Sequence, residues 1–295
     1  MGGNFRKECG LQEDDRYDDR IPQRSVSVVA GRGIHIRQFH DQGPAEGLNV
    51  ATVPRHLVDG ERVGFHPGVE PKDAATLIIV DATGTEPKVL LGRRHARHVF
   101  LPGKFVFPGG RVDVADRAMP ASKSLHPETE RKLLAETRFE SGKDAQAIAL
   151  AAIRETFEET GLVIGSEDSA KEGVPSGPWS KFVQTGFYPD LSAMRFIARA
   201  ITPPGFARRF DARFFCIEHD AVVHQLKNIV HPDAELVELT WLPISAARRV
   251  DLPVITGLVL EELQALLDAG RKPGADWPVP FYNTRDEEFT RDLIA

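Results

Sequence analysis

Short apolar runs separated by turn-forming residues predict strands in the first half of the chain. Ala74–Val80 is a nearly continuous apolar run, which is typical of a buried strand. Residues 81–87 are rich in turn formers and lead to a second run, Lys88–Gly92, so we expect the two strands to form a hairpin. Pro102–Gly110 is then expected to form a loop, a short strand and a turn.

Later segments also have strand patterns, namely Phe182–Phe187, Met194–Ile201, Arg208–Ile217 and Glu235–Trp241. In the third of these segments, apolar positions alternate with Asp211 and Arg213. Successive side chains of a strand point to opposite faces. The alternation therefore predicts a half-buried strand whose charged face, including Arg213, is turned to solvent.

Two segments before residue 162 have helical composition. Pro127–Ala135 begins with a proline, which suits the first turn of a helix. A break follows at Ser141–Lys143. Ala145–Thr160 is predicted to be a long helix, with Asp144 as its N-cap and Gly161 at its C-terminal end.

The C-terminal part of the chain has a shorter and a longer helical pattern. Leu242–Arg248 is predicted to be a short helix capped near Ser245, and Pro253–Ala269 an amphipathic helix ended by Gly270. We expect the apolar face of the longer helix to be core or a contact in a homodimer. Residues 271–295 contain Pro273, Pro278 and Pro280 and are predicted to be an irregular tail.

The composition is that of an ordinary soluble globular protein, whose 295 residues can bury a large core in one decorated domain or two small ones. A formal net charge of -6 argues against a nucleic-acid backbone as the main partner, because such binding depends on neutralising phosphates. The only cysteines are Cys9 and Cys216, so no disulfide framework is expected and a reducing cytosol fits. No window approaches the roughly 18 apolar residues of a membrane helix, so no membrane partner is expected.

The N-terminal quarter of the chain carries little pattern. Residues 1–25 are charged and poor in aliphatic side chains, which predicts disorder. They also lack the apolar core of a secretory signal. Residues 26–70 show no sustained period and are predicted to be an N-terminal extension, to which the sequence assigns no role.

Three acidic residues of the predicted long helix share one face. Glu155, Glu158 and Glu159 are spaced by helical steps, so their carboxylates are neighbours. Such charges repel one another and need a cation, and Arg154 can pair with one of them only. Carboxylate oxygens are the usual protein ligands of Mg2+ and Mn2+, so one interpretation is a metal site. The other is a solvated acidic face.

The wider sequence context favours the metal site. Arg154–Leu162 resembles the second half of the Nudix box, and Gly110 followed after five residues by Asp116 resembles its first half. Asp116 stands where the family has Glu, Thr156 stands where it has an aliphatic residue, and residues 117–153 replace a much shorter spacer. We expect this insertion to leave and rejoin the motif without separating its two halves, because loop-closure entropy grows only slowly with length.

The resemblance implies the Nudix fold, an α/β (α+β) architecture with a mixed β-sheet between α-helices. The predicted domain covers residues 71–270, with a helical insertion at 117–150. Its implied activity is hydrolysis of a phosphorus-containing acid anhydride with Mg2+ or Mn2+ as cofactor. Carried over by position, the metal ligands are Glu155, Glu158 and Glu159.

Other site residues follow from the same resemblance. Arg154 would orient a glutamate by ion pairing, and the backbone of Gly109 and Gly110 would lie beside the diphosphate. The base that takes the proton from water lies in the box or on a later loop in this family. Glu159 and Glu235 are therefore both candidates for this base, and Glu238 is the third.

Basic side chains outside the box suggest where phosphates bind. Arg93 and Arg94 begin a run of basic or potentially basic residues beside a glycine-rich segment. The run is predicted to be either a phosphate-binding surface or a solvated loop. Arg208 and Arg209 are further candidates for phosphate contacts.

The substrate prediction depends on a second resemblance. Leu90–Arg94, Gly103 and Phe107–Gly110 keep the spacing of a motif found in coenzyme A diphosphatases of the Nudix family, with departures at Gly92 and His95 among others. We therefore expect a nucleoside diphosphate linked to another moiety, such as coenzyme A or an acyl-coenzyme A. The alternatives are an ADP-ribose or nucleotide-sugar diphosphatase and a non-catalytic Nudix-fold nucleotide sensor.

Overall fold

A mixed sheet runs through the part of the chain that the computed structural model describes, which is residue 66 and residues 68–295 apart from 99, 140, 168–172, 175, 272–276 and 287. Along the sheet the strands are β10 (Leu236–Pro243), β2 (Lys88–Arg94), β1 (Lys72–Asp81), β8 (Phe210–Glu218), β7 (Arg195–Ile201), β11 (Val279–Arg285) and β12 (Glu288–Ile294). The short strands β3 (Phe105–Val106) and β4 (Gly109–Arg111) pair with β2 and β1. The β1–β8 and β7–β11 pairs are parallel, whereas β1–β2 and β7–β8 are antiparallel.

A smaller sheet and the helices complete the described structure. The smaller sheet has the order β6 (Tyr188–Pro189), β5 (Leu162–Ser166) and β9 (Val222–Gln225). The helices are α1 (Val114–Ala118), α2 (Pro127–Leu134), α3 (Gly142–Thr160), α4 (Ser180–Val183), α5 (Ile244–Ala247) and α6 (Val254–Asp268), with a 3-10 turn at His219–Ala221. The prediction of an α+β architecture with a mixed sheet is confirmed.

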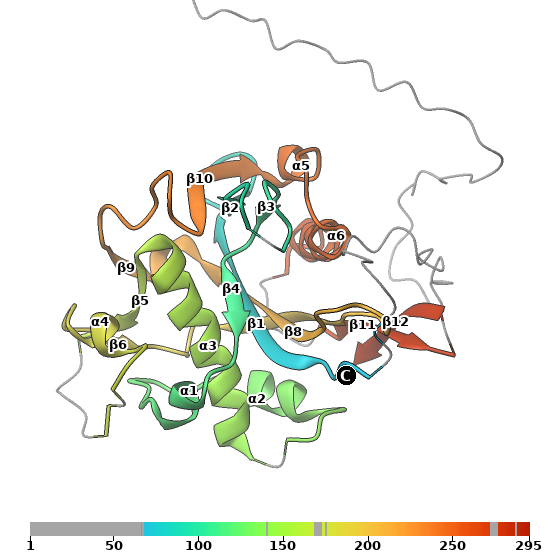
Figure 1. Ribbon diagram of the computed structural model, residues 1–295, viewed down its shortest axis with the longest axis horizontal. Helices are drawn as coiled ribbons and strands as arrows, with labels where there is room; N and C mark the ends of the chain where they lie inside the picture. Colours follow the sequence, from blue (N-terminus) through green and yellow to red (C-terminus); the bar gives the residue numbers. More distant parts are fainter. Residues whose placement is uncertain are drawn as a thin grey trace, which may run out of the picture. The chain divides into compact units, whose positions relative to one another are not determined.

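Strand β1 is buried on both faces, which explains its continuous apolar run. Leu77 and Ile79 belong to the core under α3, and Ile78 and Val80 belong to the core under α6. Figure 1 shows the two helices on opposite sides of the sheet. Burying a side chain such as Leu77 stabilises the fold by about 1.5–3 kcal/mol, so alternate residues of one strand hold both helical layers in place.

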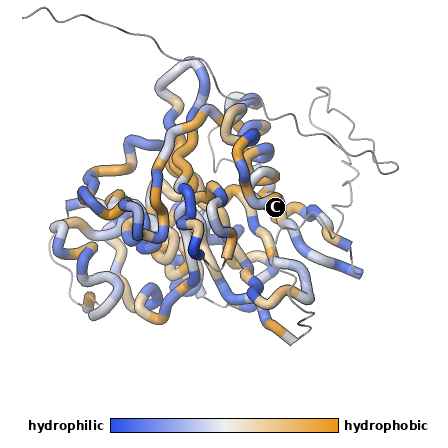
Figure 2. Tube along the Cα trace, turned by 45° about the horizontal axis from the view of Figure 1, so that its top comes forward, coloured by the Kyte–Doolittle hydropathy of each residue, from blue (hydrophilic) through white to orange (hydrophobic). Residues whose placement is uncertain are grey.

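The hydropathy of the chain follows this layering. Figure 2 shows apolar segments concentrated in the interior and polar segments at many outer turns. Among the described residues, no helix has both the length and the apolar character needed to span a membrane. The predictions for residues 1–25 and most of 26–70 fall outside the described part of the chain.

Several strand and helix predictions are confirmed, with shifted ends. β1 and β2 form the expected antiparallel pair, although β2 continues through Arg93 and Arg94, which we expected in a loop. The long helix α3 begins at Gly142 rather than after Asp144, and its N-cap is Ser141. Asp144 instead accepts a hydrogen bond from the Ser141 hydroxyl at 2.9 Å. The helix ends as predicted at Gly161, whose φ is +76°.

Four other predictions were wrong in part. Phe182–Phe187 contains helix α4 and turns instead of a strand, because Phe182 packs edge-to-face on Phe157 and Trp179. Ser245 lies inside α5 and donates to Glu86, so it is not the cap of that helix. The charged face of β8 is not in solvent, since helices cover both sides of the sheet. Arg213 on this face is 1% exposed.

The fourth error is the C-terminal segment, residues 271–295, which is not irregular throughout. Its last part forms the antiparallel hairpin β11–β12, and β11 joins β7 in parallel. Phe289 of β12 belongs to the core under α6. The hairpin is therefore an integral edge of the main sheet.

Candidate active site

The close contact between β4 and α3 forms one wall of the site. The Gly109 N–H donates to Glu159 Oε2 at 3.1 Å. A Cβ atom at Gly110 would lie 2.3 Å from Glu155 Cδ. Neither glycine has a positive φ, so the glycines are needed for close approach and not for a special turn. They lie in the short strand β4, where the sequence predicted a turn.

Arg154 joins the two halves of the box through side-chain hydrogen bonds. Its guanidinium donates to both Asp116 oxygens at 2.8 and 3.0 Å, and to the Arg111 carbonyl at 2.8 Å. It also donates to Glu155 at 2.8 Å and to Glu158 at 3.2 Å. The long insertion therefore leaves and rejoins the motif with its halves in contact, as predicted.

The role of Asp116 follows from its position. Its side chain is fully buried and accepts a hydrogen bond from Trp179 Nε1 at 3.0 Å, in addition to those from Arg154. It also closes the capping box of α1, together with Asp113. Asp116 thus holds Arg154 in place and takes no part in the carboxylate face.

The carboxylates of α3 carry more negative charge than their neighbours balance. Burial raises the pKa of Glu155 and of Glu158, and Arg154 offsets this only in part. Burial raises the pKa of Glu159 well above its ordinary value, and the charges of Glu235 and Glu155 raise it further. Such a group of oxygens is chemically suited to a divalent cation.

The donor set therefore fits Mg2+ or Mn2+ in its chemistry. Because Gly110 has no Cβ, the Glu155 carboxylate can lie directly against the β4 backbone. Within the described residues, no three carboxylate, imidazole or thiol groups already converge on one point. The Glu155 and Glu158 oxygens are bonded to Arg154 instead.

Glu235, directly before β10, faces this carboxylate group across the cavity. Arg94 donates to Glu235 Oε1 at 2.8 Å and contacts His98 Nδ1 at 3.1 Å. Glu238, the third candidate base, pairs with Arg93, and both side chains are more than 40% exposed. The structure thus brings Glu235 to the site and places Glu238 and Arg93 on its outside.

A cavity of about 460 Å³ connects these groups. Seven of the residues predicted for the site line it, namely Arg94, Gly109, Gly110, Glu155, Glu159, Arg208 and Glu235. Glu158 and Arg154 do not line it, and Arg154 donates a hydrogen bond to Glu158 at 3.2 Å. Two of the three predicted ligands, Glu155 and Glu159, and one predicted base, Glu235, therefore line the same cavity.

Arg208 lines the cavity, and Arg209 does not. Arg209 donates to the carbonyls of Thr202 and Val69 at 2.9 and 2.8 Å. The alternation of residues along the strand does distinguish Arg208 from Arg209 in the sequence. Phe210, Ala212 and Phe214 all line the cavity, and Arg208 continues their alternation. Sequence reasoning also missed Arg111, although it directly follows Gly110 in β4. It missed the aromatic lining because those residues come from segments distant in the chain.

No family model matches the sequence. The chain is 29% identical to the acyl-coenzyme A diphosphatase NUDT19 of Gallus gallus, over 44% of this chain and 48% of that protein, so it spans about half the length of this curated relative. It is similar to a solved NUDIX hydrolase structure from Alicyclobacillus acidocaldarius, with 27% identity, a TM-score of 0.50, and coverage of 67% of this chain and 93% of the other. A MutT protein structure from Methanosarcina mazei Go1 matches at 17% identity and a TM-score of 0.37, covering 66% and 95% of the two chains.

The relative and the Alicyclobacillus structure both point to the family that the interrupted box resembles. The geometry agrees with them, since Arg154 joins the two halves of that box. The chain therefore has the Nudix fold and is similar to Nudix hydrolases in sequence and structure.

Proposed function

We propose that this protein hydrolyses the diphosphate bond of a nucleoside diphosphate linked to another moiety, with Mg2+ or Mn2+ as cofactor. The observation that carries the proposal is the convergence of Glu155, Glu159 and Glu235 on one cavity beside the Gly109–Gly110 backbone. Carboxylates from two elements around a pocket suit both metal binding and proton transfer.

Each residue has a definite task in this proposal. Glu155, Glu158 and Glu159 would hold the metal, which would supply neutralisation of the anhydride oxygens and a lowered pKa for the attacking water. Arg154 fixes Glu155 and Glu158 through its hydrogen bonds. Glu235 takes the proton from water, because it faces the site from another element and Arg94 orients it. Glu159 is the alternative base.

The finer proposal is a coenzyme A or acyl-coenzyme A substrate. Two features support it: the spacing of Leu90–Arg94 and Phe107–Gly110, and the similarity to a protein named as an acyl-coenzyme A diphosphatase. ADP-ribose and nucleotide sugars are the next candidates. A non-catalytic sensor is less well supported, because Asp116 and Thr156 are both buried and leave the carboxylate face intact.

The test is a direct assay of purified protein with Mg2+ or Mn2+. Coenzyme A, an acyl-coenzyme A, ADP-ribose and UDP-glucose would be supplied, and phosphomonoester products measured. We expect turnover of the coenzyme A compounds and a loss of about 10²-fold or more in Glu158→Gln. The matched control is Glu261→Gln, an exposed glutamate of α6 that lies outside the cavity.

Two results would count against the proposal. Absence of turnover for every diphosphate, with folded protein and added metal, would show that the chain is a binding module. Unchanged turnover in Glu158→Gln would show that Glu158 is not a metal ligand.

A further inference from the structure

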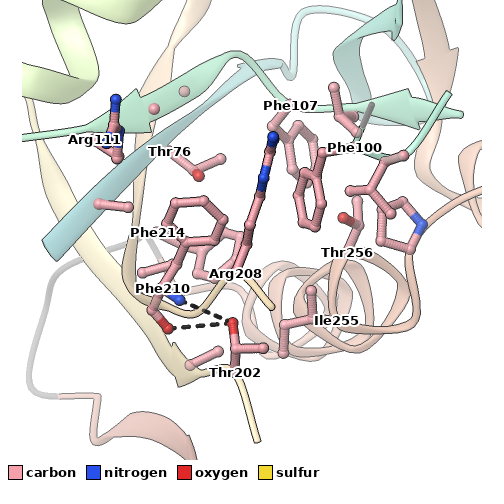
Figure 3. A pocket seen from close by; sticks show the side chains of 18 of the residues that line it. Thr76, Phe100, Phe107, Arg111, Thr202, Arg208, Phe210, Phe214, Ile255 and Thr256 are labelled. Atoms are coloured by element: carbon pink, nitrogen blue, oxygen red, sulfur yellow. Dashed lines mark hydrogen bonds between the residues drawn. The ribbon is translucent and has the colours of Figure 1, made fainter. Parts of the chain in front are cut away.

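The cavity has a second end with a different character. Beyond the carboxylates its walls are mostly aromatic and aliphatic. We call this end the distal compartment, and define it by the side chains of Phe100, Phe210, Phe214, Ile255 and Phe289. These residues come from the loop after β2 and from β8, α6 and β12. Figure 3 shows that Phe100, Phe210, Phe214 and Ile255 surround one space.

The distal compartment offers few hydrogen-bonding groups. Two threonines, Thr202 and Thr256, line its edge. The Thr202 hydroxyl already accepts a hydrogen bond from the Phe210 N–H at 3.0 Å. A nucleobase placed here would lose water from its polar edge without gaining matching partners, which is costly. A hydrocarbon group would gain free energy from the same burial. The lining therefore favours a hydrocarbon group.

Arg208 crosses the cavity between aromatic side chains. In Figure 3 its side chain crosses the middle of the pocket, with Phe214 on one side and Phe100 and Phe107 on the other. Among the residues that the structure describes, no hydrogen bond or ion pair of its guanidinium is found, in contrast to Arg209. An arginine in such a position is suited to a phosphate oxygen.

We propose that the distal compartment is a second subsite that binds a hydrocarbon group carried by the diphosphate substrate. Arg208 binds an anionic oxygen where the polar and apolar parts of that substrate meet. The subsite rests on the diphosphate hydrolysis proposed above, and adds a preference for apolar substrates that the carboxylate site alone would not give.

The experiment uses a series of ADP β-alkyl esters with methyl, butyl and octyl groups. Because each buried methylene contributes to binding, we expect kcat/KM to rise by about tenfold or more from the methyl to the octyl ester. Ile255→Trp narrows the distal compartment. It should lower kcat/KM for the octyl ester by about tenfold, and much less for the methyl ester.

Arg208 is tested with the same esters. Arg208→Gln should raise KM for all of them by about tenfold, and Arg208→Lys should restore part of this, because it keeps the charge. Arg249→Gln is the control, since Arg249 is exposed and does not line the cavity. Circular dichroism would establish that each variant is folded.

The outcomes separate this proposal from the proposed function. Equal kcat/KM across the esters, with normal hydrolysis, overturns the subsite alone. An equal loss for all esters in Ile255→Trp shows that the compartment holds the adenine, and this also overturns it. If no ester is hydrolysed although coenzyme A is, the proposed function stands; if none of the diphosphates is hydrolysed, the proposed function fails. Calorimetric binding then decides the subsite: tighter binding of the octyl ester supports it, and equal binding overturns it.

Discussion

Two groups of buried charges in this molecule differ in their balance. One group, which we call the paired cluster, consists of Arg199, Arg213, Asp73 and Asp211. Arg199 donates to both oxygens of Asp211 at 2.9 and 2.8 Å, and Arg213 donates to Asp73 at 2.8 Å. Two buried cations thus face two anions, and the exposed Arg138 adds a third cation at Asp73, at 3.2 Å. Arg154 of α3 is shared among Asp116, Glu155 and Glu158, and within the described part of the chain the one hydrogen bond to the Glu159 carboxylate comes from the Gly109 backbone N–H.

The difference separates a structural role from a functional one. The charged members of the paired cluster do not line the cavity, and they fix β1, β7 and β8 relative to each other. The acidic face of α3 opens into the cavity through Glu155 and Glu159. A buried surplus of negative charge is unfavourable unless a cation joins it. Proximity of charges alone would not have distinguished the two groups.

The largest expected effects come from changing one carboxylate in each group. Glu159→Gln should lower kcat by about 10²-fold or more and leave folding largely intact. Asp73→Asn should lower the free energy of unfolding by about 3 kcal/mol, because it leaves Arg213 without one of its partners. Its kcat per folded molecule should be unchanged. Denaturant unfolding and steady-state kinetics on both variants measure this, and a kcat loss in Asp73→Asn would contradict the assignment.

The next effect concerns Arg94, which the sequence assigned to substrate binding. Since Arg94 donates to Glu235 at 2.8 Å, we expect it to position the base. Arg94→Gln should then lower kcat by about tenfold or more with little change in KM. In combination with Glu235→Gln the losses should not add. A raised KM with unchanged kcat would show instead that Arg94 binds the substrate.

The two glycines of β4 should respond differently to the same substitution. A Cβ at Gly110 would meet the flexible end of Glu155 at 2.3 Å, whereas one at Gly109 would meet the backbone oxygen of Ala75 at 2.5 Å. Gly110→Ala should therefore displace Glu155, lowering kcat by about tenfold at little cost in stability. Gly109→Ala should lower the melting temperature more. Equal melting temperatures for the two variants would contradict this distinction.

The smallest effect is expected at Glu238. It pairs with Arg93 on the surface, where such pairs contribute about 0–1 kcal/mol. Glu238→Gln should keep kcat within about twofold of the wild type, since the residue lies outside the cavity. A loss as large as that of Glu235→Gln would make Glu238 the base.

The parts of the fold that the sequence predicted were those determined by local pattern. β1 and α3 have apolar positions of the right period, and their ends carry turn or cap residues. The β11–β12 hairpin was missed because Pro280 lies inside β11, and the turn uses Asp286 at a φ of +47° without a glycine. Phe182 was misassigned because tertiary contacts with Phe157 and Trp179 outweigh its local pattern.

The site likewise has features that the sequence predicted and features that it could not predict. Helical spacing predicted the shared face of Glu155, Glu158 and Glu159, since this depends on one element only. The pairing of Arg94 with Glu235 depends on strands β2 and β10 lying side by side, with Leu236 opposite Arg94. The distal compartment needs Ile255 and Phe289 to meet across the fold. Sequence spacing contains no information on such distances.

Direct measurement of Mn2+ binding tests the central claim, which is that the acidic face of α3 binds a divalent ion. Electron paramagnetic resonance reports free Mn2+ during titration of the full chain, without substrate. We predict saturable binding in the wild type and in Asp73→Asn, and binding weakened by about tenfold or more in Glu155→Gln, Glu158→Gln and Glu159→Gln. Equal Mn2+ affinity in the wild type and all three glutamine variants would contradict the account.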